Sequence, residues 1–255
     1  MTEHSGRFTG KAAEYAQYRE RYHPDVVLPL LREWCGLTAE WTVADIGAGT
    51  GMVGDLFRAN GNRVIAIEPN AEMRDACASL HADDGLYDVL EGSAEMTGLP
   101  DASVEMIAVG RALHWFDVEA ALVEFRRVLK ARGWVAILAC GRKEDGREEN
   151  VEFKKLMQTK TGRDLYLDPL LAVYRRLDTL FAGGRFFHAD VPGELRLEWD
   201  ELRGLTLSLS HAPMPSSAAF ADFETELRGY FDRFEQDGRV TMTSCTWMSA
   251  GQFAE

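Results

Sequence analysis

The chain has few cysteines, a deficit of positive charge and no long apolar run. Its 255 residues include 28 Lys and Arg against 41 Asp and Glu, which gives a formal net charge of -13 at pH 7. Proteins that bind nucleic acid or anionic membrane surfaces need clustered Lys and Arg, and the sequence has no such cluster. We therefore expect neither nucleic acid nor a membrane as a partner.

The remaining absences concern membrane spans, secretion and metal. The longest purely apolar stretch, Trp134 to Cys140, has seven residues, whereas a membrane-spanning helix needs about 20. The opening residues, MTEHSGRF, lack the apolar core of a secretory signal. The four cysteines (35, 77, 140 and 245) are at least 42 residues apart, so no pair has the spacing of a zinc site. These features predict a cytoplasmic protein with reduced cysteines and no metal ion.

Short apolar strands alternate with amphipathic helices in the first half of the chain. Such alternation is typical of a parallel, doubly wound α/β sheet. The second half begins with a charged loop over 141–150 and continues as helical segments, a strand over 195–199, a helix over 220–234 and a strand over 240–247. The expected strands of the first half are 41–46, 63–67, 86–90, 104–109 and 134–140, with helices over 50–60, 71–81 and from Asp117 onward.

A glycine-rich turn follows the first expected strand. Residues 43–51 read VADIGAGTG, and Glu68 follows the next strand. A strand, a turn of this kind and a helix start together hold a nucleotide-like cofactor at the carboxyl ends of the strands. Because residues 49–54 also match the dinucleotide fingerprint, a nicotinamide or flavin enzyme is one alternative.

Asp45, two residues before the first glycine, distinguishes the possible cofactors. A dinucleotide places its phosphates at the helix amino end, close to this carboxylate. Two unit charges about 6 Å apart repel by about 2–3 kcal/mol at an effective dielectric constant near 20. S-adenosylmethionine instead carries an ammonium and a sulfonium, while Glu68 suits the ribose of either ligand. The competing interpretation is that Asp45 only caps the turn after its strand.

Several further motifs occur in order along the chain. They are YRERYHP (18–24), DIGAGTG (45–51), IEPNAEM (67–73), GSAE (92–95), RALHWF (111–116) and RVLK (127–130). With these motifs the chain resembles the class I S-adenosylmethionine-dependent methyltransferases. More narrowly, it resembles a small-molecule, type 11-like branch with a His-Trp-Phe signature. The resemblance implies a Rossmann-like, mostly parallel seven-stranded sheet whose last strand inserts antiparallel, with S-adenosyl-L-methionine as cofactor.

The resemblance also implies roles for individual residues. Glu68 would accept the ribose hydroxyls, Asp45 would anchor the amino end of the methionine part, and Arg19 would pair with its carboxylate while Tyr18 closes a lid. The implied cofactor site comprises Tyr18, Arg19, Asp45, Gly47, Ala48, Gly49, Glu68, Pro69, Met73, Ser93, Ala94, Glu95, Gly110 and Arg111.

The acceptor side of the site is less defined. His114 is either a general base or a structural link after the fourth strand. Tyr22, Trp115 and His211 are candidate substrate contacts. Arg111 replaces a more common small or amide residue, so it either points outward or binds an anionic substrate.

Taken together, these features predict a methyltransferase that acts on a small-molecule methyl acceptor by in-line transfer. The alternatives are a relative that binds S-adenosylmethionine without methyl transfer or alkylates carbon or lipid, and, more remotely, a nicotinamide oxidoreductase. We expect a single domain over 1–255, with a helical lid over 1–36, a cofactor-binding core over 41–140 and helical covering segments and late strands over 141–236. The sequence specifies neither the acceptor nor the oligomeric state.

Overall fold

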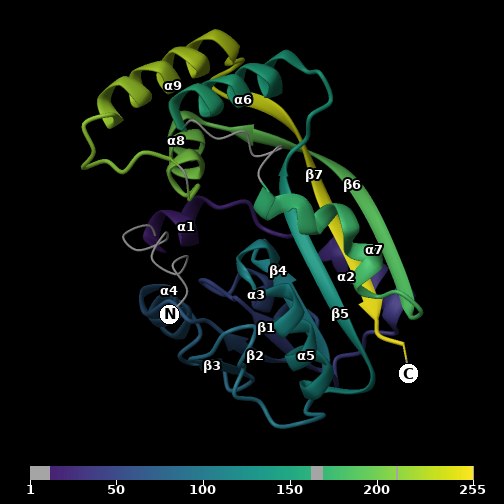
Figure 1. Cartoon of the computed structure of the whole chain (residues 1–255). Coiled ribbons are helices and arrows are strands. Elements are labelled where there is room, and N and C mark those ends of the chain that lie inside the picture. The colour runs from purple at the N-terminus through teal and green to yellow at the C-terminus, as the bar shows by residue number, and fades with distance from the viewer. Residues whose placement is uncertain (1–11, 162–168, 211, 255) are drawn as a thin grey trace.

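The protein is built on one seven-stranded sheet, seen in a computed structural model that describes residues 12–161, 169–210 and 212–254 (Figure 1). The strand order is β3-β2-β1-β4-β5-β7-β6. The first five strands pair in parallel, and β7 pairs antiparallel with both β5 and β6. This confirms the expected Rossmann-like α/β fold, including the antiparallel insertion of the last strand. The strands are β1 (Thr42–Ile46), β2 (Arg63–Ile67), β3 (Tyr87–Leu90), β4 (Val104–Gly110), β5 (Leu129–Arg142), β6 (Arg185–Leu197) and β7 (Val240–Gln252).

Helices cover both faces of the sheet because its central strands are apolar on both sides. Along β1, Val43 belongs to one buried cluster and its neighbour Ala44 to the other. The first cluster packs under α2 (Pro24–Cys35), α3 (Met52–Ala59) and α4 (Ala71–Leu80). The second packs under η2 (Leu113–Trp115), α5 (Val118–Val128) and α7 (Leu177–Leu180). The alternation of side chains along a strand thus produces the doubly wound arrangement.

Side-chain caps fix the starts of two helices beside the carboxyl ends of the strands. The Asn70 side chain accepts a hydrogen bond from the Met73 N–H and begins α4. Asp117 accepts from the Ala120 N–H and begins α5, as the sequence predicted. The loops that precede these helices are therefore held in place at the end of the sheet where a ligand would bind.

A third, smaller apolar cluster lies beyond the core. The long strands β5, β6 and β7 run past the parallel sheet, and Figure 1 shows α6 (Glu148–Thr161), α8 (Trp199–Leu207) and α9 (Phe220–Phe234) gathered at their far end. Phe153 from α6, Leu202 from α8 and Phe223 from α9 pack together there. We call this unit of three helices and strand ends the cap.

The strand predicted over 195–199 was placed incorrectly. The strand β6 spans Arg185–Leu197, and Trp199 already belongs to α8. The strand lies at the sheet edge and alternates exposed and half-buried side chains, with Pro192 and Gly193 in its middle. It therefore lacks the apolar run that marks a buried strand.

The amino-terminal segment connects the core to the cap. The helix α1 (Ala12–Tyr18) lies against α8, where the Tyr18 ring occupies the space that a Cβ on Gly204 would fill. The expected break at His23–Pro24 is present, since α2 begins at Pro24. Among the described residues, no helix is both long and apolar enough to cross a membrane.

Candidate functional site

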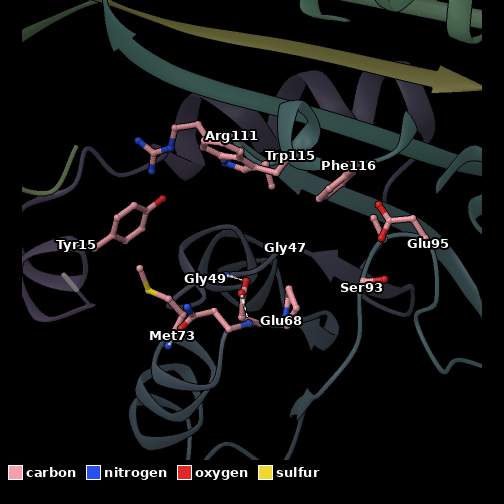
Figure 2. Close-up of a pocket in the computed structure, with 15 residues that line it drawn as sticks. Tyr15, Gly47, Gly49, Glu68, Met73, Ser93, Glu95, Arg111, Trp115 and Phe116 are labelled. Atoms are coloured by element: carbon pink, nitrogen blue, oxygen red, sulfur yellow. Dashed lines mark hydrogen bonds between the residues drawn. The ribbon is translucent and has the colours of Figure 1, made fainter. Parts of the chain in front are cut away.

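A pocket opens at the carboxyl ends of β1, β2 and β4. Figure 2 shows the glycine turn after β1 near its centre, with Arg111 and Tyr15 toward one end and Ser93 and Glu95 toward the other. Ten of the fourteen predicted cofactor residues line it, and so does Trp115, which was predicted to contact substrate. The lining residues are Tyr15, Gly47, Gly49, Glu68, Pro69, Asn70, Met73, Ser93, Ala94, Glu95, Gly110, Arg111, Ala112, Trp115 and Phe116.

The two lining glycines of the turn are required for different reasons. Both have left-handed backbone, with φ of 68° at Gly47 and 59° at Gly49. A Cβ on Gly47 would lie 2.8 Å from the Cβ of Ala112, so this glycine allows the turn to pack on the loop after β4. Among the described residues, a Cβ on Gly49 would meet only the Tyr15 ring, at 3.9 Å, and would project into the pocket. Gly49 therefore keeps its backbone open to a ligand.

Glu68 ties the end of β2 to the glycine turn. Its Oε2 accepts from the Gly49 N–H and its Oε1 from the Asn70 N–H, both at 2.8 Å. The residue is 8% exposed, and burial raises the pKa of its carboxyl while these hydrogen bonds oppose the rise. Each oxygen keeps a second lone pair for a ligand hydroxyl.

Asp45 has one satisfied and one unsatisfied oxygen. The side chain is buried, and its Oδ2 accepts from the Gly54 N–H at 2.9 Å. Its Oδ1 is also buried and has no hydrogen-bond partner among the described residues. Burial and the nearby negative charge of Glu68 raise the pKa of Asp45 to about 7, although the hydrogen bond from the Gly54 N–H acts in the opposite direction. A role as a turn cap accounts for Oδ2 alone. It leaves Oδ1 unpaired, and an unpaired buried carboxylate oxygen is costly.

Arg111 points inward. It has a left-handed φ of 53°, and only 9% of its side chain is exposed. Its Nη2 donates to the Glu20 carbonyl at 3.0 Å and its Nη1 to the Cys140 Sγ at 3.4 Å. Its Nε is buried without a partner in the described part of the chain. The alternative that Arg111 points outward is therefore wrong.

Arg19 and Glu20 belong to a buried cluster of charged residues around Arg111. Arg19 has buried Nε and Nη1 atoms that make no hydrogen bond to any described residue. The Glu20 carboxylate lies 3.3 Å from the Arg142 Nη1 and 3.8 Å from the Arg111 Nη1. We call Arg19, Arg111, Arg142 and Glu20 the arginine cluster; it lies next to the pocket.

The other predicted residues that the structure describes are not among those that line the pocket. The His114 Nδ1 is 3.2 Å from the Tyr174 hydroxyl of η3 (Pro169–Arg176). The Tyr22 hydroxyl donates to the Leu138 carbonyl at 3.2 Å and is buried. Tyr18 lies against Gly204, and His211 falls outside the described residues. Tyr18, Arg19, Asp45 and Ala48 are not among the residues that line the pocket.

Sequence reasoning assigned no role to some of the lining residues. Asn70 follows Glu68-Pro69 directly and begins α4, so its position after the second strand was a usable signal. Tyr15 lies one turn before Tyr18 and Arg19, on the same segment. Within the described residues, no group of His, Cys, Asp and Glu could hold a metal ion.

Sequence comparisons find similarity to methyltransferases. Residues 44–137 match a family model described as a methyltransferase domain. An uncharacterized methyltransferase of Mycobacterium tuberculosis is 32% identical over 157 residues, which are 62% of this chain and 59% of that protein. The malonyl-acyl-carrier-protein O-methyltransferase of Yersinia pestis is 38% identical over 94 residues, 36% of this chain and 34% of that protein. The chain thus spans less than two thirds of the length of these curated relatives.

Two solved structures share the fold over most of this chain. A candidate type II methyltransferase from Anaeromyxobacter dehalogenans superposes with a TM-score of 0.69 at 21% identity, covering 93% of this chain and 100% of that one. The YcgJ protein of Bacillus subtilis gives a TM-score of 0.55 at 23% identity, covering 89% and 98%. Residues 44–137, which contain the glycine turn, Asp45 and Glu68, are thus similar to a methyltransferase domain, and the chain shares its fold with these two solved structures.

Proposed function

We propose that the protein is an S-adenosylmethionine-dependent methyltransferase that acts on a small molecule by in-line methyl transfer. The observation that carries this proposal is the buried, unpartnered Oδ1 of Asp45 behind the glycine turn. An ammonium satisfies such an atom, directly or through water, whereas a pyrophosphate would be repelled by it.

The residues that line the pocket fit the same ligand. The open backbone at Gly49 would accept the methionine part, Glu68 would accept the ribose hydroxyls, and Ser93 and Glu95 would contact the adenine at the far end of the pocket. When bound, the sulfonium supplies an already activated methyl group, so the chain needs mainly to position an acceptor.

The lid and the cap support a small acceptor. Tyr15 of α1 lines the pocket while Tyr18 of the same helix packs on α8 of the cap. An acceptor must therefore fit beneath a segment that joins core and cap. We propose that the lid, core and cap act as one methyltransferase domain on this acceptor, with neither nucleic acid nor membrane as partner, in keeping with the net charge of -13.

Methyl transfer itself tests the proposal. The purified protein would be incubated with S-adenosylmethionine and small carboxylic acids, phenols, amines and alcohols, and formation of S-adenosylhomocysteine would be measured by mass spectrometry. Acceptor-dependent formation above the acceptor-free rate is the expected result. Tight cofactor binding without turnover on any acceptor class would instead favour a binding protein of the same fold.

The affinity for S-adenosylhomocysteine should depend on pH through Asp45. With a pKa of about 7 in the free protein, this carboxyl must lose its proton before it can hold the ligand ammonium. Affinity should therefore fall about tenfold per pH unit below about 7 and level off above it, with proton uptake by the buffer on binding. The check is calorimetry from pH 5.5 to 8.5 in two buffers of different ionisation enthalpy; a pH-independent affinity would contradict the role of Asp45.

Replacing Glu68 by alanine should weaken S-adenosylhomocysteine binding by about 1.5–3 kcal/mol, because hydrogen bonds to a charged group are lost. Glutamine should not fully substitute. Both carboxylate oxygens accept backbone N–H groups, and an amide nitrogen facing Gly49 or Asn70 would place donor against donor. Calorimetry of both variants is the measurement, and wild-type affinity in both would show that the ribose lies elsewhere.

A further inference from the structure

We propose that the methyl acceptor is a small organic carboxylate and that Arg111 holds its carboxyl group. This inference rests on the proposed function and specifies the class of its substrate. It begins from an imbalance of buried charge beside the pocket, where Arg111 and Arg142 share the Glu20 carboxylate and Arg19 has no ion pair with a described residue.

The arginine cluster carries a net positive charge that the described residues do not neutralise. Glu20 is shared between Arg111 and Arg142, at 3.8 and 3.3 Å. Arg19 has no ion pair with any described residue, and burial and the neighbouring Arg111 lower its pKa. Arginine keeps its charge in proteins, so a buried excess of guanidinium is stable only when an anion joins it.

The cofactor accounts for one of these cations. Arg19, on the lid, would pair with the methionine carboxylate of the donor, and Arg142 is already paired with Glu20. Arg111 is the arginine of the cluster that lines the pocket. Only 9% of its side chain is exposed, and its Nε has no partner among the described residues. Figure 2 places it beside Tyr15 and Trp115, away from the Ser93 and Glu95 end.

Backbone geometry at Arg111 supports a functional role. Its φ of 53° lies in the left-handed region, which a long side chain rarely adopts. The conformation is held by the Arg111 N–H, which donates to the Leu138 carbonyl of β5 at 2.9 Å. Glycine or asparagine would adopt it with less strain. A strained residue that directs a buried cation into a pocket is typical of a ligand-binding position.

A carboxylate also suits the surroundings of His114. Transfer forms a bond from a carboxylate oxygen to the methyl carbon, breaks the bond from that carbon to sulfur, and leaves the electron pair on sulfur. The products are a methyl ester and a neutral thioether, and no proton moves. A free general base is therefore not needed, and the His114 Nδ1 is 3.2 Å from the Tyr174 hydroxyl.

Arg111 should affect acceptor binding more than the chemical step. The negative charge of the acceptor disappears as the new bond forms, so the attraction to the guanidinium is strongest before transfer. Loss of Arg111 should therefore raise KM for a carboxylate and change kcat little.

The test measures binding as well as turnover. Benzoate, phenylacetate, succinate and octanoate would each be compared with the corresponding primary amide. Calorimetry would use protein saturated with S-adenosylhomocysteine, whose sulfur is neutral and does not interact with the arginine charge. The variants are Arg111→Asn, which tolerates left-handed backbone, and Arg111→Lys, which keeps a charge without the planar fork. Arg126→Gln is the control, because Arg126 lies over Phe253 away from the pocket.

At least one carboxylate should bind 10- to 100-fold more tightly than its amide to the wild type and to Arg126→Gln. Arg111→Asn should abolish that preference, and Arg111→Lys should retain part of it, both measured with the variant saturated by S-adenosylhomocysteine, whatever its affinity for that ligand. No preference for any carboxylate, or a preference that survives in Arg111→Asn, would overturn the inference. Turnover of neutral acceptors would then leave the proposed function intact, whereas failure of the wild type to bind S-adenosylhomocysteine would overturn the proposed function itself.

Discussion

Replacing Asp45 by asparagine is expected to weaken S-adenosylhomocysteine binding by roughly 10- to 100-fold without loss of the fold. Asparagine can still accept from the Gly54 N–H through its side-chain oxygen, so the structural contact survives. It presents an uncharged amide where the unpartnered Oδ1 now lies, so the attraction to the ligand ammonium is lost. A hydrogen bond to a charged group contributes about 1.5–3 kcal/mol, which is the source of the expected factor.

The same variant separates binding from folding. Because the pKa of Asp45 is raised to about 7 in the folded protein, its ionisation lowers the free energy of unfolding as the pH rises from about 4 to 7. Above pH 7 this loss of stability stays constant. At pH 8 the ligand-free Asp45→Asn protein should therefore have a Tm equal to or above that of wild type. Asp75→Asn, at an exposed position of α4, is a matched control with unchanged affinity. Wild-type affinity in Asp45→Asn would show that the carboxylate only caps the turn.

A valine at Gly49 is expected to abolish detectable cofactor binding while the protein stays folded. Left-handed backbone with a β-branched side chain costs about 1–2 kcal/mol of folding stability. The nearest described side chain to an added Cβ is the Tyr15 ring, at 3.9 Å, so we expect the steric effect to act mainly on the ligand. Thermal unfolding should show a modest loss of Tm, and calorimetry should show no heat of S-adenosylhomocysteine binding.

Gly36→Val is the matched control for this variant. Gly36 also has left-handed backbone, with φ of 75°, and a Cβ there would have no neighbour within 4 Å in the described part of the chain. It ends α2, outside the residues that line the pocket. The two valines should lower Tm by similar amounts, but only the one at position 49 should remove ligand binding. Equal ligand affinity in both would mean that the glycine turn does not contact the cofactor.

The sequence predicted the parallel core well because each buried strand is a short apolar run closed by a turn residue or a helix start. The glycine turn after β1 and Glu68 after β2 are adjacent to strand ends, and parallel strands bring such ends together. The edge strand β6 was largely missed because its exposed alternation resembles a polar loop. In β5, the strand begins at Leu129 instead of after Gly133, since α5 ends at Val128.

The arginine cluster could not be predicted from local pattern. Arg19, Arg111 and Arg142 are far apart in the chain and meet because the amino-terminal segment around Glu20 crosses the ends of β4 and β5. Arg111 drew attention as an unusual residue after the fourth strand, but its inward direction follows from its left-handed backbone and from the Glu20 carbonyl that accepts from it. Tertiary contacts of this kind have no sequence period.

The most direct measurement is calorimetric titration of the wild-type protein at pH 8 with S-adenosylmethionine, S-adenosylhomocysteine and NAD in parallel. A site built from an open glycine turn, the Asp45 carboxylate and Glu68 should bind both adenosyl compounds at one site per chain and give no heat with NAD. Saturable binding of NAD with no binding of either adenosyl compound would contradict the assignment of this pocket to a methyl donor.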